Sequence, residues 1–120
     1  MRTMQQRHGD WAEQRIVDLL QQRGWQLLDR QWHCRWGELD LILHKQERLL
    51  LVEVKARRAG SLDGGGVAAL GRSKRLRLER SWNCWLAAHA RWRLSPVEMV
   101  AALVTLPPAD QPVRWIRLNN

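Results

Sequence analysis

The segment ELDLILHKQERLLLVEVK, residues 38–55, carries the clearest structural signal in this chain. Two apolar runs, 38–43 and 49–55, have the length and composition of β-strands, and the polar residues between them are typical of a hairpin turn. Side chains alternate between the two faces of a strand, so this hairpin would carry acids and a lysine within a sheet. Asp is depleted in strands, which means that these positions need a chemical or structural explanation.

A turn centred on residues 46–47 fixes the register of the two strands. In that register Asp40 lies directly across from Glu53, and Glu38 lies across from Lys55. These four residues share one face with apolar neighbours, which indicates partial burial: Ile42, Leu49 and Leu51. The opposite face would be pure core: Leu39, Leu41, Leu43, Leu50, Val52 and Val54.

The facing carboxylates of Asp40 and Glu53 present an electrostatic conflict. Like charges directly opposite on a sheet cost roughly 0.2–1 kcal/mol, and more when they are removed from water. A divalent metal ion between them would remove this conflict. The alternative is that both acids point to solvent, while Glu38 and Lys55 form an ordinary cross-strand ion pair of little energetic value.

Length and charge limit the class of protein. A chain of 120 residues with 45% hydrophobic content is the size of one domain, which we expect to span residues 1–120. Lys and Arg number 20 against 12 acids, giving a net charge of +8. Arginine forms bidentate contacts with phosphate, so the excess favours a polyanionic partner such as nucleic acid, the alternative being a merely basic surface.

Cysteine and histidine usage gives no sign of zinc. Cys34 and Cys84 are far apart in the sequence and form no CxxC motif, and the four histidines lack tetrahedral zinc spacing. Residues 1–5 contain no hydrophobic signal region, and no apolar run approaches about 18 residues. We therefore expect a cytoplasmic protein with reduced thiols and no membrane segment.

The other elements are expected to flank this hairpin. Asp10 followed by Glu13 resembles a helix capping box, which would give Glu13 a purely structural role, and Gly24 is placed to end that helix. The predicted order is a helix (9–23), a strand (25–32), the hairpin, a helix (73–90) and two strands (97–106 and 113–118). This order predicts an α/β fold with a mixed central β-sheet flanked by helices.

Several ordered blocks of the sequence resemble a known family: 9–13 (GDWAE), 24–25 (GW), 37–42 (GELDLI), 52–58 (VEVKARR) and the glycine-rich to basic segment 64–74. Together they look like the bacterial YraN family. An Asp in one strand and Glu-x-Lys in the next also resemble the PD-(D/E)xK nuclease superfamily, and YraN is similar to archaeal Holliday junction resolvases. The chain departs from the family pattern in the penultimate strand, where Val97-Glu98-Met99-Val100 replaces an arginine-aromatic-aspartate run.

The resemblance implies a restriction-endonuclease-like core and a Mg²⁺-dependent or Mn²⁺-dependent endonuclease. Asp40 and Glu53 would bind the metal, and Lys55 would orient or activate the attacking water. Glu13 would bind a second metal through water or hold Lys55 in place. The substrate would be a phosphodiester of DNA, with branched DNA as one candidate, and paired cleavage points in a junction would favour a homodimer.

A basic surface would bind the phosphate backbone, with affinity that falls steeply with salt. Five basic residues crowd the first half of a helix, where they oppose its dipole unless a phosphate offsets the cost: Arg72, Lys74, Arg75, Arg77 and Arg80. The full predicted set is Arg35, Arg57, Arg58, Arg72, Lys74 and Arg75. The rival interpretation is a non-catalytic nucleic-acid-binding module on the same fold, and a third is a protein-interaction domain that uses its tryptophans.

Overall fold

The computed structural model describes residues 1–60 and 71–119. Along the chain these ranges form α1 (Met4–Gln22), β1 (Gln26–Cys34), β2 (Gly37–Lys45), β3 (Arg48–Arg57), α2 (Arg72–Ala88), the short 3-10 helix η2 (Ala90–Trp92), β4 (Val97–Thr105) and β5 (Arg114–Arg117). The predicted order of elements is confirmed. The glycine-rich residues 64–66 lie outside the described residues.

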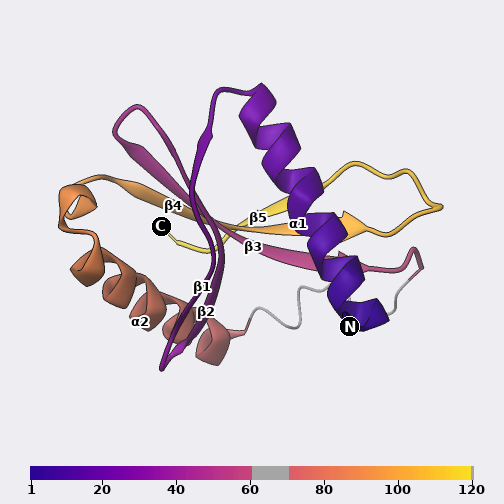
Figure 1. Cartoon of the computed structure of the whole chain (residues 1–120), viewed down its shortest axis with the longest axis horizontal. Helices are drawn as coiled ribbons and strands as arrows, with labels where there is room; N and C mark the ends of the chain where they lie inside the picture. The colour runs from indigo at the N-terminus through magenta and orange to yellow at the C-terminus, as the bar shows by residue number, and fades with distance from the viewer. Residues whose placement is uncertain (61–70, 120) are drawn as a thin grey trace.

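The described strands form a five-stranded sheet in the order β1-β2-β3-β4-β5. Strands β3 and β4 are parallel, while every other neighbouring pair is antiparallel, so the sheet is mixed as predicted. Figure 1 shows the long β3 and β4 crossing the molecule, with α2 in the connection between them. Parallel neighbours need such a crossover, which here carries the basic helix to the edge of the acidic strands.

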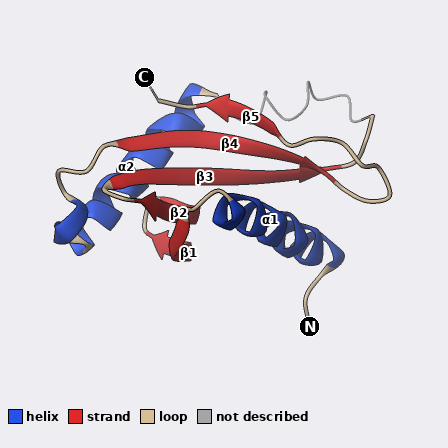
Figure 2. Ribbon diagram, turned by 90° about the horizontal axis from the view of Figure 1, so that it is seen from above, coloured by secondary structure: helices blue, strands red, loops and turns tan. Residues whose placement is uncertain are grey.

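The two long helices cover opposite faces of the sheet (Figure 2). The α1 side of the core contains Ala12, Ile16, Val17, Leu20, Leu41, Leu43, Leu50, Val52, Val100, Ala102 and Val104. The α2 side contains Leu39, Ile42, Leu49, Leu51, Leu78, Trp82, Trp85, Trp92 and Met99. Burial on both faces explains why β3 is a nearly continuous apolar run.

The hairpin register is confirmed from its turn as far as the pair Leu41 and Val52. A two-residue loop joins the strands, and Gln46 takes a φ of 57° in it. Paired residues at the loop are Lys45 and Arg48, as the sequence predicted.

The start of the first helix differs from the prediction. Helix α1 begins at Met4, five residues before the expected position, because Thr3 and Gln6 form a capping box. The capping box predicted for Asp10 and Glu13 is wrong, since both residues lie within the helix.

The predicted helix end is confirmed. Gly24 adopts a φ of 92°, and its N–H and that of Trp25 donate to the carbonyls of Gln21 and Leu20 at 3.1 Å each. This pattern is a Schellman motif, which turns the chain toward β1.

The alternation predicted for β2 breaks at Asp40. Leu39 was expected to share a face with Leu41, but Leu41 packs on the α1 side, whereas Leu39 packs on the α2 side with Ile42. The break coincides with Gln31, which faces this point from β1 and has a φ of 51°, a left-handed conformation rare for residues other than glycine. This irregular backbone interrupts the regular alternation of side chains, and Leu39 and Leu41 therefore face opposite sides of the sheet.

Candidate functional site

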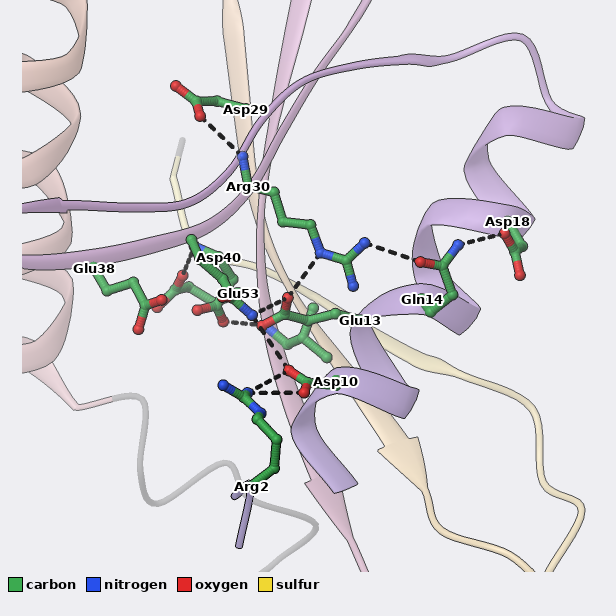
Figure 3. Close-up of polar contacts among 12 residues, drawn as sticks. Arg2, Asp10, Glu13, Gln14, Asp18, Asp29, Arg30, Glu38, Asp40 and Glu53 are labelled. Atoms are coloured by element: carbon green, nitrogen blue, oxygen red, sulfur yellow. Dashed lines mark hydrogen bonds and ion pairs between the residues drawn. The ribbon is translucent and has the colours of Figure 1, made fainter. Parts of the chain in front are cut away.

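The candidate site forms where the pairing of β2 with β3 ends. The N–H of Val54 donates to Asp40 Oδ2 at 2.8 Å, and the N–H of Asp40 donates to Glu53 Oε2 at 3.3 Å. Side chains therefore take over bonds that the backbone ladder makes elsewhere. Figure 3 shows the two carboxyl groups side by side between α1 and α2, with Glu38 next to them.

A small cleft opens over these acids, with a volume of about 140 Å³. It has room for several water molecules. All four acidic and basic residues that the sequence placed on one face of the hairpin line this cleft. The complete lining is Glu38, Asp40, Glu53, Val54, Lys55, Lys74 and Ala101.

Two lysines flank the acids in different ways. Lys55 is exposed at the rim and lines the cleft. Lys74, from the first turn of α2, lies with its Nζ 3.5 Å from Glu53 Oε1. The sequence suggested Lys74 as a phosphate contact only, and its ion pair with Glu53 is visible only in the folded chain.

Burial makes the negatively charged form of both acids unfavourable. It raises the pKa of Asp40 to about 8, and the adjacent Glu53 carboxylate adds to this effect, as do the charges of Glu13 and Glu38. Burial also raises the pKa of Glu53, although the Lys74 ammonium and the Asp40 N–H oppose the change. The alternative in which both acids point to solvent does not hold, because Glu53 is only 7% exposed and Asp40 is half-buried.

The donors present suit a hard divalent cation. Carboxylate oxygens are the ligands that Mg²⁺ and Mn²⁺ prefer, and a cation here would relieve the charge that raises the pKa of Asp40. Within residues 1–60 and 71–119, however, no group of three or more His, Cys, Asp and Glu side chains is arranged to hold an ion. A metal would thus depend on two side chains, with water and backbone oxygens completing its shell, as Mg²⁺ commonly does.

Glu13 approaches the site from α1 and is only 8% exposed. It accepts hydrogen bonds from Gln31 Nε2 at 3.0 Å and from Arg30 Nε at 3.3 Å (Figure 3). These bonds lower the pKa of Glu13 less than burial raises it. Its charge reaches Asp40, but Arg30 and Gln31 are its direct partners, so a metal-binding role for Glu13 stays a prediction.

The predicted nucleic-acid-binding residues fall into two groups. Arg57 ends β3 and Arg58 follows it, at the end of the strand that carries Glu53 and Lys55. The second group surrounds the N-terminal turn of α2 and the β1–β2 turn: Arg35, Arg72, Lys74 and Arg75. That helix turn has no acid and no side-chain cap, so its dipole and its side chains add to one positive field.

The structure adds residues to the second group. The guanidinium groups of Arg35 and Arg80 lie 4.6 and 4.7 Å from the ring centre of Trp36, in the β1–β2 turn. Arg77 lines a neighbouring hollow with Trp36 and Lys74. The sequence placed Arg77 and Arg80 in the basic cluster of this helix, but only the fold shows that they lie beside Trp36.

These features define an α/β protein with a five-stranded mixed sheet flanked by two helices in the described ranges, consistent with a restriction-endonuclease-like core. Within the described helices, no segment has the length and apolar character needed to cross a membrane. The pattern of the uncharacterised protein family UPF0102 matches residues 12–102, and the chain belongs to this family. YraN is the same family, so the predicted membership of the YraN family is confirmed.

Relatives align over nearly the whole chain. A UPF0102 protein of Prochlorococcus marinus (strain MIT 9303) is 50% identical over 114 residues, covering 95% of this chain and 90% of its own length. Another, from Synechococcus sp. (strain CC9902), is 49% identical over 118 residues and covers 98% of both chains. A UPF0102 protein of Herpetosiphon aurantiacus is 41% identical over 102 residues, with coverage of 82% and 81%.

Proposed function

We propose that this protein is a metal-dependent nuclease that binds DNA and hydrolyses a phosphodiester. One observation carries the proposal: Asp40 and Glu53, from neighbouring strands, are locked side by side in a partly buried cleft with lysines at its rim. Adjacent buried carboxylates destabilise each other, and a binding function gives a reason for them.

In this proposal Asp40 and Glu53 hold one Mg²⁺ or Mn²⁺. When bound, such an ion neutralises phosphate charge and lowers the pKa of a water ligand. Lys55 lies two residues beyond Glu53, on the same face of β3 and exposed at the rim, where it would orient the attacking water and stabilise developing negative charge. Lys74 would exchange its ion pair with Glu53 for a contact with the phosphate.

The basic groups at the end of β3 and at the start of α2 would hold the DNA backbone across the cleft. Their position around the acids supports a substrate that approaches as a polyanion, since the acids alone would repel it. Branched DNA is the finer proposal. A junction offers two symmetric cleavage points, which a homodimer would match.

The rival function is a nucleic-acid-binding module without catalysis. The ion pair between Lys74 and Glu53 favours it, because an ammonium group at 3.5 Å already compensates one of the two acids. In this alternative the acids position α2, and the basic surface alone is functional.

Cleavage assays separate the two functions. Duplex, single-stranded and four-way-junction DNA are incubated with Mg²⁺, Mn²⁺ or EDTA, using the intact chain and the variants Asp40→Asn, Glu53→Gln and Lys55→Met. The nuclease proposal expects metal-dependent cutting that falls by at least about a hundredfold in each variant, with DNA binding retained. Asp18→Asn, an exposed acid on α1, is the matched control and should cut normally. Absence of cutting by the intact chain on every substrate, with tight binding, would leave the binding module.

A further inference from the structure

The structure brings together the two cysteines, which lie 50 positions apart in the sequence (34 and 84). Cys34 is the last residue of β1, and Cys84 lies in α2. Their side chains lie close enough to interact with each other, and both are partly exposed. Ser81, one helical turn before Cys84, also bonds to Cys34, so both α2 residues face the end of β1.

The surroundings of Cys34 differ from those of Cys84. The N–H of Trp36 donates to Cys34 Sγ at 3.4 Å, and Gly37 contributes a second backbone bond. Gly37 has a φ of 139°, which side chains rarely adopt, and a Cβ placed there would lie 3.8 Å from Ser81 Oγ, so α2 packs directly against the end of β1. The sulfur of Cys34 is thus held in a ring of donors from the β1–β2 turn and α2.

These contacts divide the chemistry between the two thiols. Burial raises the pKa of the Cys34 thiol, but the bonds from Ser81, Trp36, Cys84 and Gly37 outweigh it and lower the pKa below its ordinary value. Burial and the neighbouring Cys34 raise the pKa of Cys84. Thiolate character governs oxidation, so Cys34 has the properties of the attacking sulfur and Cys84 those of the resolving thiol.

We propose that Cys34 and Cys84 form a peroxide-sensitive dithiol that closes into a disulfide between β1 and α2. The Cys34 thiolate attacks a hydroperoxide: an S–O bond forms, the O–O bond breaks, and hydroxide leaves as water after taking a proton. The sulfur of Cys84 then attacks the Cys34 sulfenic acid, forming the S–S bond and breaking the S–O bond, and a second water departs with the Cys84 proton. Two thiols are oxidised by two electrons, and one peroxide is reduced.

Two further observations favour a redox pair over the alternatives. Within the described ranges the two sulfurs have no third His, Cys, Asp or Glu with which to bind a metal. Both thiols are free in the structure, and if the protein is cytoplasmic, as the sequence leads us to expect, a disulfide between them would be transient and sensing. Closure would tie α2, which carries Lys74, to β1, the neighbour of the strand that carries Asp40. The proposal itself does not rest on nuclease activity.

The test follows the chain's two cysteines by mass. Dilute reduced protein is treated with hydrogen peroxide, then with N-ethylmaleimide, and weighed intact. The reduced protein should take up two maleimides. The oxidised monomer should take up none and should be lighter by two hydrogens, and dithiothreitol should restore the reduced mass. In Cys84→Ser, dimedone should trap a sulfenic acid at Cys34, and it should do so about tenfold faster than it labels Cys84 in Cys34→Ser.

Unfolded wild-type protein in urea is the matched control. Its two thiols should close at least about tenfold more slowly, because the fold no longer holds them together. The proposal is overturned if peroxide leaves both maleimide sites on the folded protein, or if disulfides form only between chains. It is equally overturned if closure is as fast in urea, or if both single-cysteine variants oxidise at the same rate.

Discussion

Asp40 and Glu53 are joined through the backbone of Asp40, whose N–H donates to Glu53 Oε2 at 3.3 Å, while the Asp40 carboxylate accepts from Val54 at 2.8 Å. Each acid therefore fixes the position of the other. A carboxylate that replaces a ladder bond is oriented without a flexible loop, which is what a binding site requires.

Removing either acid should weaken metal binding. Loss of a residue that only supports a metal ligand typically lowers metal affinity by roughly 10- to 100-fold. Asp40→Asn and Glu53→Gln should each lower Mg²⁺ affinity by more than this, because each removes a carboxylate that binds the ion directly in the proposed site. Isothermal titration would measure this, with Asp18→Asn as the control. Unchanged affinity in both variants would contradict the proposed site.

The stability of the metal-free protein should depend on pH. Because the pKa of Asp40 is raised to about 8, the folded chain keeps a proton that the unfolded chain loses above pH ~4. The free energy of unfolding should fall as pH rises from about 4 to about 8, by at most about 1.4 kcal/mol per unit from this group. Urea unfolding across this range measures it.

The matched variant for that experiment is Asp40→Asn, which cannot ionise and should flatten this part of the profile. Saturating Mg²⁺ should flatten it too, since the ion favours the charged acids and expels the proton. A profile identical in the wild type and Asp40→Asn would count against the raised pKa.

Lys74 should compete with the metal. Its Nζ lies 3.5 Å from Glu53 Oε1, so Lys74→Met should raise Mg²⁺ affinity by roughly two- to fivefold, as expected for an ion pair whose lysine is half-exposed. The titration is run at pH 9, where loss of the ammonium cannot be masked by protonation of Asp40. Arg93→Met, an exposed charge beyond the opposite end of α2, removes the same charge and should leave the affinity unchanged.

The affinity for DNA should depend less steeply on salt concentration when a single basic residue is neutralised. Each of Arg58→Gln and Arg72→Gln should reduce the slope of log affinity against log salt by about 0.9, the value for one phosphate contact on duplex DNA. Fluorescence anisotropy at several salt concentrations measures the slope. Arg93→Gln should not change it, and an equal change there would show a response to net charge alone.

The core beneath α2 should depend on Trp85. This side chain is 1% exposed, stacks between Trp82 and His89, and donates its indole N–H to Asp29 at 3.1 Å. Trp85→Ala should lower the free energy of unfolding by about 3–5 kcal/mol, measured by urea denaturation. Trp11→Ala, at a site that is 40% exposed, should cost far less.

Local pattern was sufficient for much of the fold. Alternating apolar residues and a polar turn predicted the pairing of Leu41 with Val52, and Gly24 predicted the end of α1. Both signals are local, because the alternation of side chains in a strand and the backbone conformation of a glycine depend on only a few neighbouring residues. The same reasoning failed at the start of α1, where Thr3 provided a better cap than Asp10.

The amino-acid order alone therefore determined the sequence of helices and strands, the hairpin register and the approach of Asp40 to Glu53. It could not give the ion pair of Lys74 with Glu53, the bonds from Gln31 to Glu13 or the contact of Cys34 with Cys84. Those contacts join residues far apart in the chain. They exist because α1 and α2 pack on opposite faces of one sheet, and side-chain packing over that distance leaves no periodic signal in a single sequence.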